Sequence, residues 1–284
     1  MRRAGLTWDG DPRVKPPFGA AEVDWGHPLT ASLITRGLLN ESGGPVYGLG
    51  QVVPVLAPTA IIRTVGPKGT GCAFDGTSSY LKGALGILPS GDVTVGAWVR
   101  TPAALINNYP QIGSLNGDAS GVNGLNLYLY RPSAQNQFSF IVKTGGEAWG
   151  NDWVLTPAGF VQPSTDYFVC GVRSGATMLV YVDGVLQGTD VGTAGAITYD
   201  ASPTLQLGTK QSASVPTDAN WSGIIYDYVL LNAAINSSEM LQLHVEPYAM
   251  LRPRVPRRYF VPAAAGGMLP YTPLRRRRRR RLLT

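Results

Sequence analysis

Short apolar runs, broken by glycine, proline, asparagine and aspartate, repeat along most of the chain. In Leu125–Tyr130 the leucines occupy every second position, and after a turn Phe138, Phe140 and Val142 do the same. Side chains alternate between the two faces of a strand, so each segment has one buried face and the pair forms a hairpin. No long helical period interrupts this pattern, which predicts an all-β fold.

A second hairpin is predicted at Asp183-Gly184. The apolar run 178–182 meets this dipeptide and resumes as Val185-Leu186-Gln187. A type I′ turn requires positive φ at both central residues, which Asp-Gly tolerates well. We therefore expect strands on both sides of the dipeptide.

Two segments are apolar on both faces, namely residues 93–99 and 224–231. A central strand covered on both sides requires this character, so both segments are expected deep in a stacked, two-sheet antiparallel β-sandwich. Asn236, with Glu239 three residues later, predicts the capped start of one short helix that ends before Pro247.

Charge divides the chain into parts. The net charge is +6, but residues 252–284 contain eleven arginines and no acid, whereas residues 1–251 hold 13 basic and 18 acidic residues. We predict an N-terminal arm (1–22) that orders only against another surface, the sandwich (23–249), and a Pro/Arg-rich strap with a poly-Arg tail (250–284). The predicted assembly or anion-binding residues are Arg252, Arg254, Arg257, Arg258, Arg275, Arg276, Arg277, Arg278, Arg279, Arg280 and Arg281.

The arginine-rich segment has several potential uses. It can bind nucleic acid, an acidic surface of a neighbouring protein or an anionic host surface, and a solvated tail without a partner is the alternative. Cys72 and Cys170 are too few for a disulfide framework and are expected as free, buried thiols, with a single disulfide as the alternative. We expect neither a membrane-spanning segment nor a signal peptide.

The order of several motifs resembles the laminin-G-like jelly roll of the concanavalin A-like lectin/glucanase superfamily, including members found in phage and prophage proteins. The resemblance covers residues 23–249. The motifs are the opening 23–29 with 37–41, a predicted early strand pair at 74–81, the tryptophan-containing strand 93–99, the hairpin 181–184, and the closing strand 223–232 with Glu239. The resemblance implies two stacked antiparallel sheets, a carbohydrate- or protein-binding surface and, in some members, one calcium ion.

Catalytic chemistry is not expected. Glycosidases of this superfamily carry a Glu-x-Asp-x-Glu strand, which is absent, and the five glutamates are scattered along the chain. His27 and His244 are too few for a metal cluster. We expect His27 at the entry to a strand and His244 near the end of a helix. The expectation is a protein without enzymatic activity or an obligatory cofactor.

The segment 145–153 is the best candidate for carbohydrate binding. Sugars bind by stacking on aromatic rings while amide and carboxylate side chains take the hydroxyls. The predicted contacts are Trp149, Asn151, Asp152, Trp153, Asp118 and Trp221. The alternative is that the tryptophans only cover one end of the sandwich. Calcium would need about six to eight oxygen ligands, and no such set can be assigned from sequence.

The resemblance to phage-encoded members, whose tails the Arg-Pro strap after residue 248 is similar to, implies together with the two charged terminal segments a bacteriophage virion structural or adhesion protein. The jelly roll would bind or decorate, and the terminal segments would attach it to other virion proteins. Host surface glycans and copies of the same chain within a particle are the further expected partners. The alternatives are a free carbohydrate-binding module outside a virion and, less favoured, a glycoside hydrolase. The expected location is the virion, after synthesis in the host cytoplasm.

Overall fold

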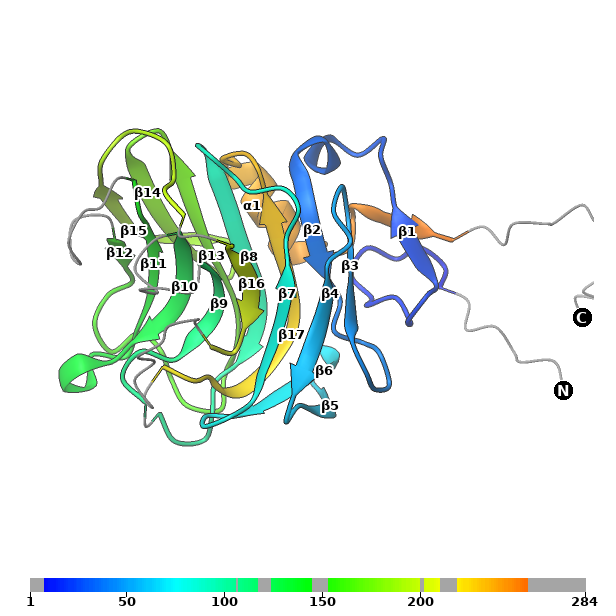
Figure 1. Ribbon diagram of the computed structural model, residues 1–284, viewed down its shortest axis with the longest axis horizontal. Coiled ribbons are helices and arrows are strands. Elements are labelled where there is room, and N and C mark those ends of the chain that lie inside the picture. The colour runs from blue at the N-terminus through cyan, green and yellow to red at the C-terminus, as the bar shows by residue number, and fades with distance from the viewer. Residues whose placement is uncertain are drawn as a thin grey trace, which may run out of the picture. The chain divides into compact units, whose positions relative to one another are not determined.

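The computed structural model describes residues 8–105, 107–116, 124–144, 153–199, 202–209 and 219–254. These residues form an antiparallel β-sandwich (Figure 1). We call one layer the β10 sheet. Its strands, in hydrogen-bonded order, are β12 (Trp153–Leu155), β11 (Gln137–Val142), β10 (Leu125–Tyr130), β9 (Gln111–Asn116), β16 (Thr204–Leu207), β7 (Tyr80–Ala84) and β4 (Val55–Thr59).

The other layer, the helix-side sheet, carries the single α-helix of the described residues, α1 (Ser237–Val245), on its outer face (Figure 1). Its strands run in the order β2 (Leu33–Gly37), β17 (Ser222–Leu231), β8 (Val93–Arg100), β13 (Asp166–Ser174), β14 (Thr177–Val182) and β15 (Val185–Val191). The hairpin of β5 (Ile62–Gly66) and β6 (Gly69–Asp75) extends this sheet, with β6 paired to β17.

One strand connects the two layers. β3 (Val46–Leu49) pairs with β2 of the helix-side sheet and with β4 of the β10 sheet, so the hydrogen-bonded ladder runs from one layer into the other. A small separate sheet pairs β1 (Ala21–Val23) with β18 (Leu251–Pro253). Two 3₁₀ turns, η1 (Pro28–Ser32) and η2 (Pro132–Ala134), complete the elements.

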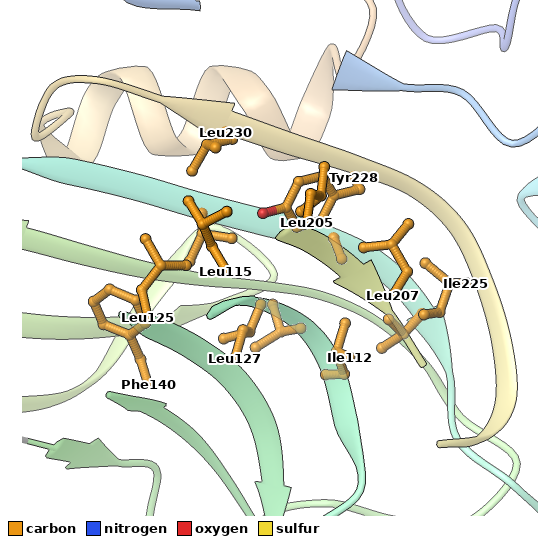
Figure 2. Close-up of a cluster of buried hydrophobic side chains, with 14 of the residues drawn as sticks. Ile112, Leu115, Leu125, Leu127, Phe140, Leu205, Leu207, Ile225, Tyr228 and Leu230 are labelled. Atoms are coloured by element: carbon orange, nitrogen blue, oxygen red, sulfur yellow. The ribbon is translucent and has the colours of Figure 1, made fainter. Parts of the chain in front are cut away.

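The main core lies between the two layers. Ile225, Tyr228 and Leu230 of β17 face apolar side chains of the β10 sheet, as Figure 2 shows. The alternation predicted for β10 and β11 is confirmed, because their registers place Leu125, Leu127 and Leu129 opposite Val142, Phe140 and Phe138 in this core. Burial of this shared apolar surface, at roughly 25 cal/mol per Å², is what holds the layers together.

A second apolar cluster covers the outer face of the helix-side sheet. Trp98, Phe168 and Tyr226 project from its strands and pack with Met240 and Leu243 of α1. The central strands β8 and β17 are therefore buried on both faces, as their apolar sequences predicted. The helix begins at a capping box in which Asn236 accepts from the backbone N–H groups of residues 238 and 239 and Glu239 accepts from the N–H of residue 236.

The N-terminal segment differs from the expectation that residues 1–22 order only against another molecule. In the described part, 8–22, Trp8 is buried in the second cluster. The Lys15 ammonium donates to the carbonyl oxygens of Thr70 and Tyr226 at 2.6 and 2.5 Å. The reason is that the helix-side sheet exposes an apolar strip and unpaired carbonyls that this segment covers. Residues 1–7 and 255–284 lie outside the described residues, and the predicted domain boundaries stay predictions.

Other local predictions have clear outcomes. Asp183 and Gly184 have φ values of 51° and 79°, so the predicted turn with two positive φ angles is confirmed. Cys72 and Cys170 are both free and buried. The two strands predicted as an early pair, β6 and β7, both form, but they are not hydrogen-bonded to each other. β6 pairs with β17 in the helix-side sheet, whereas β7 pairs with β16 and β4 in the β10 sheet. The chain therefore crosses from one layer to the other at Gly76.

None of the helices in the described part of the chain has the length and apolar character that a bilayer crossing requires.

Candidate functional site

Most residues predicted from the sequence to bind carbohydrate lie outside the described residues. These are Asp118, Trp149, Asn151 and Asp152. Of the six, the structure places Trp153, at the start of β12, and Trp221, immediately before β17. The two tryptophans have different surroundings.

Trp221 does not fit the role predicted for it. The side chain is fully buried in the main core, where it borders a cavity of only about 10 Å³ with Pro102, Leu129 and Ser222. A cavity of this size holds at most about one water molecule. The aromatic face is taken up by the core packing of the sandwich end, so Trp221 offers no surface to a sugar.

Trp153 belongs to a cluster of aromatic side chains that sequence reasoning missed. Its ring meets that of Tyr130 edge-on, with centroids 5.0 Å apart, and Tyr130 in turn meets Tyr109 edge-on at 5.8 Å. Tyr109 is 36% exposed, and Tyr130 and Trp153 are half-buried. We call these three residues the aromatic cluster.

The aromatic cluster continues onto the β10 sheet. Tyr128 lies two residues before Tyr130 on β10 and is buried, and burial raises the pKa of its hydroxyl well above the usual range. The charged forms of Tyr130 and Tyr109 would raise this pKa further. Tyr128 therefore stays neutral at physiological pH and keeps an O–H to donate.

Strand registers join the aromatic cluster to a row of polar side chains. Partners across neighbouring strands share a face of the sheet. On the face opposite the core, one such row runs across β7, β16, β9, β10, β11 and β12 through Lys82, Gln206, Ser114, Asn126, Ile141 and Trp153. The next row contains Gln111, Tyr128, Ser139 and Leu155.

Three amide side chains on this face keep unused hydrogen-bonding atoms, although they are buried. Asn126 is 2% exposed, and neither its Oδ1 nor its Nδ2 has a partner. The Oε1 atoms of Gln111 and Gln137 are also without partners, while their Nε2 atoms donate to the carbonyl oxygens of Tyr109 and Thr156. A buried polar atom without a partner costs about 1–3 kcal/mol. Retention of three such side chains on one face points to a binding surface.

Comparison with known families decides the classification. A family model described as the concanavalin A-like lectin/glucanases superfamily matches residues 75–240, from the end of β6 into α1. The chain belongs to this superfamily. The match confirms the laminin-G-like resemblance and the jelly-roll fold expected from it. No curated protein sequence matches the chain.

Solved structures of the same fold are similar to this superfamily member at low sequence identity. The binding domain of Paraclostridial Mosquitocidal Protein 1 is 13% identical, with a TM-score of 0.59, over 76% of this chain and 52% of that one. The botulinum neurotoxin serotype D binding domain is 10% identical, with a TM-score of 0.57, over 77% and 52%. A Trypanosoma rangeli sialidase is 16% identical, with a TM-score of 0.53, over 77% and 33%. This chain spans about half the length of the first two.

The lectin-like domain lacks carboxylates on the strands of its polar face. No position in β4, β7, β9, β10, β11, β12 or β16 is Asp or Glu. A glycosidase of the usual kind needs two carboxyl groups on opposite sides of the scissile bond. Within the described residues, no group of three or more His, Cys, Asp or Glu side chains is placed to hold a metal ion either.

The two described arginines of the C-terminal segment lie on or beside β18. Arg252 donates from Nε to the Glu22 carboxylate at 3.0 Å across the β1–β18 pair, and Asp24 lies 4.0 Å from its Nη1. Arg254 is exposed, and its backbone N–H donates to the carbonyl oxygen of residue 20. Arg257, Arg258 and the run Arg275–Arg281 lie outside the described residues.

Part of the polar face could have been found from the sequence. Once Leu125, Leu127 and Leu129 are assigned to the core, alternation places Asn126, Tyr128 and Tyr130 on the other face. Tyr109 is different, because it precedes β9 and meets Tyr130 only through tertiary folding. No pattern in the sequence indicates that contact.

Proposed function

We propose that this chain is a non-enzymatic, glycan-binding module of a bacteriophage particle, and that the glycan binds on the polar face of the β10 sheet at the aromatic cluster. The chain is a lectin-like jelly-roll binding domain. The observation that carries the proposal is the combination on one face of aromatic rings in edge-on contact, buried amides with unpartnered atoms and no strand carboxylate.

The chemistry of that face fits an uncharged sugar. Aromatic rings receive the apolar C–H face of a pyranose, and amides both donate to and accept from its hydroxyls. Asn126 offers one unused donor site and one unused acceptor. Since Asn126 is almost fully buried and Tyr109 is exposed, a glycan contacts the aromatic cluster first and reaches the amide only if the face opens.

The similar structures support binding rather than catalysis. The mosquitocidal and botulinum structures are binding domains by name, whereas the sialidase is an enzyme of which the matched part is one third. The absence of strand carboxylates on the polar face favours the first kind.

Glycan binding is tested with the full-length chain on a glycan array, followed by titration of the best ligand. We expect Tyr130→Ala and Trp153→Ala each to weaken binding by about 1–2 kcal/mol, or roughly tenfold. Tyr47→Ala is the matched control, because Tyr47 is also a strand tyrosine, 46% exposed, but lies on β3. Equal binding by all four proteins would place the glycan elsewhere.

The virion part of the proposal is supported by the arginine-rich C-terminal segment. Seven consecutive arginines favour a polyanionic or acidic partner, and a domain that binds a free glycan has no need of them. Particles assembled with the wild-type chain and with a variant in which Arg275–Arg281 are all glutamine can be compared by mass spectrometry. We expect the variant to be lost from particles while its glycan binding is unchanged. Equal incorporation would instead favour a free carbohydrate-binding module.

A further inference from the structure

A hollow of about 490 Å³ lies on the outer face of the helix-side sheet, on the opposite layer from the polar face. Its lining comes from five separate parts of the chain. The lining residues are Trp98 of β8, Asp166 of β13, Asp183 of the Asp183-Gly184 turn, His244 of α1, and Pro67 with Lys68 of the two-residue turn between β5 and β6.

The Trp98 ring already holds a cation. The Lys68 ammonium lies 3.9 Å from the ring centroid, and the His244 ring stacks on Trp98 at 5.3 Å with an interplanar angle of 26°. Cations are attracted to the face of an indole because its π-system is electron-rich, and the attraction grows when water is excluded. Trp98 is only 5% exposed, and its Nε1 has no hydrogen-bond partner.

Two further groups in the hollow are able to accept hydrogen bonds. Asp183 accepts from the backbone N–H of residue 168 through Oδ1, which leaves its Oδ2 available, and its side chain is 42% exposed. His244 Nδ1 has no partner and lies 3.9 Å from Asp183 Oδ1, too far for a hydrogen bond. Burial lowers the pKa of His244, so the ring is neutral at pH 7 and one ring nitrogen accepts.

The electrostatics of the hollow favour a positive group. Asp166 is already matched, because Arg100 and the Tyr226 hydroxyl both donate to its carboxylate. Asp183 is then the lining carboxylate that forms no ion pair with a described lysine or arginine. The last residues of α1 also border the adjoining hollow, and a helix C-terminus favours cations.

The adjoining hollow shares Lys68, Trp98 and His244 and is also lined by Arg13 and Lys15. Those two cations are matched within the chain. Arg13 pairs with Asp11 at 3.1 Å, and Lys15 donates to two backbone carbonyls. They do not turn the Trp98 hollow into a site for anions.

We propose that this hollow is a second binding site, which takes a lysine or arginine side chain of a partner protein in the position over Trp98 that Lys68 now fills. Lys68 acts as a tethered substitute for the incoming cation. Its position in a two-residue turn at the tip of an edge hairpin lets the side chain swing aside without disturbing either strand. The partner's cation then lies on Trp98, with Asp183 and His244 as acceptors.

The test follows the Trp98 indole N–H in the ¹H–¹⁵N spectrum of the full-length chain during titration with Nα-acetyl-lysine methylamide and Nα-acetyl-arginine methylamide. Trp98→Phe assigns the resonance. Lys68→Ala vacates the position over the ring, so we expect it to bind both probes about tenfold more tightly than wild type. Lys68→Arg, the matched control that keeps a cation, is expected to bind as wild type does.

Asp183→Asn keeps the turn, because asparagine also tolerates positive φ, but removes the charge. Added to Lys68→Ala, it is expected to abolish the tenfold gain. The proposal is overturned if Lys68→Ala binds the probes no better than wild type, or if the neutral probe Nα-acetyl-norleucine methylamide binds equally well. Binding of inorganic phosphate that is lost in Lys68→Ala would also overturn it, since the hollow would then be an anion site. None of these variants touches the β10 sheet, so the outcome is independent of glycan binding.

Discussion

Arg36 and Asp227 form an ion pair inside the protein, with Arg36 Nη2 and Asp227 Oδ2 2.6 Å apart and side chains 2% and 0% exposed. The pair joins β2 to β17. Arg36 also donates from Nη1 to the carbonyl oxygen of Pro247 and lies over the Tyr248 ring, 5.1 Å from its centroid. One guanidinium therefore connects the sheet to the segment that follows α1.

This arrangement predicts a strong effect of removing one partner. Asp227→Ala leaves the guanidinium buried without its counter-ion, which is expected to lower the free energy of unfolding by about 3–5 kcal/mol. The double variant Arg36→Met/Asp227→Leu removes both charges and should be clearly more stable than Asp227→Ala. Urea unfolding of the three proteins measures the difference. A double variant no more stable than the single one would contradict the argument.

Gly171 on β13 has no room for a side chain. A Cβ at this position would lie 2.2 Å from Cγ of Phe140, which packs on the glycine from the opposite layer. Gly171→Ala forces the layers apart and is expected to cost about 1–3 kcal/mol in urea unfolding. Gly91→Ala is the matched control, because nothing lies within 4 Å of its Cβ position. Equal stability of the two variants would show that Phe140 can move aside.

Substitution of Asn126 distinguishes a role in glycan binding from a role in stability. Its amide is buried with both polar atoms unpartnered, so Asn126→Leu replaces an unsatisfied group by an apolar one of similar size. We expect the variant to be about 1–3 kcal/mol more stable than wild type and to bind glycan more weakly. Thermal unfolding and glycan titration on the same preparation give both quantities. Increased stability with unchanged binding would remove Asn126 from the proposed site.

The two thiols are expected to be unreactive in the folded protein. Burial raises the pKa of Cys72 to about 11 and that of Cys170 further still, and the thiolate is the reactive form. A colorimetric thiol reagent at pH 8 should therefore detect neither cysteine until urea is added. Cys72→Ala and Cys170→Ala, measured separately, assign the signal. Rapid reaction in the absence of urea would show that one thiol is reached by solvent.

Lys15 predicts a specific pH dependence. Burial lowers the pKa of its ammonium from 10.5 to about 8. Between these values the unfolded chain binds more protons than the folded one, so this residue makes the protein more stable as pH rises from 8 to 10.5, by at most roughly 3 kcal/mol.

Lys15→Met is the comparison for that effect. The raised pKa values of the buried thiols act in the opposite direction, but both proteins contain the thiols, so most of this contribution cancels in the difference. The free energy of unfolding of wild type minus that of Lys15→Met is thus expected to increase between pH 7 and 10. A constant difference would mean that the Lys15 ammonium is not buried in solution.

The strands were predictable because their local sequence already contains the information. Alternation in residues 125–130 and the Asp183-Gly184 dipeptide specify face and turn without reference to the rest of the chain. The packing of residues 8–22 was not predictable in the same way. Trp8 and Lys15 lie in a Gly- and Pro-rich segment without a period, and their burial depends on a strip that only the assembled sheet presents.

The residues of the two candidate sites also divide into those that local sequence predicts and those that only the folded chain brings together. Trp221 and Trp153 looked equivalent in sequence, as tryptophans beside polar residues, yet one is in the core and the other is in the aromatic cluster. The Lys68–Trp98 contact joins residues from a hairpin tip and a central strand, and no sequence spacing encodes it.

The two ends of the main ladder, β12 and β15, lie against each other. A Cβ at Gly188 of β15 would be 2.1 Å from the carbonyl oxygen of Leu155 in β12, so only glycine allows the approach. Unpaired strand edges are where separate molecules most readily join into aggregates. The contact at Gly188 occupies part of the outer edge of each strand, so a strand of another molecule finds less free backbone there to pair with.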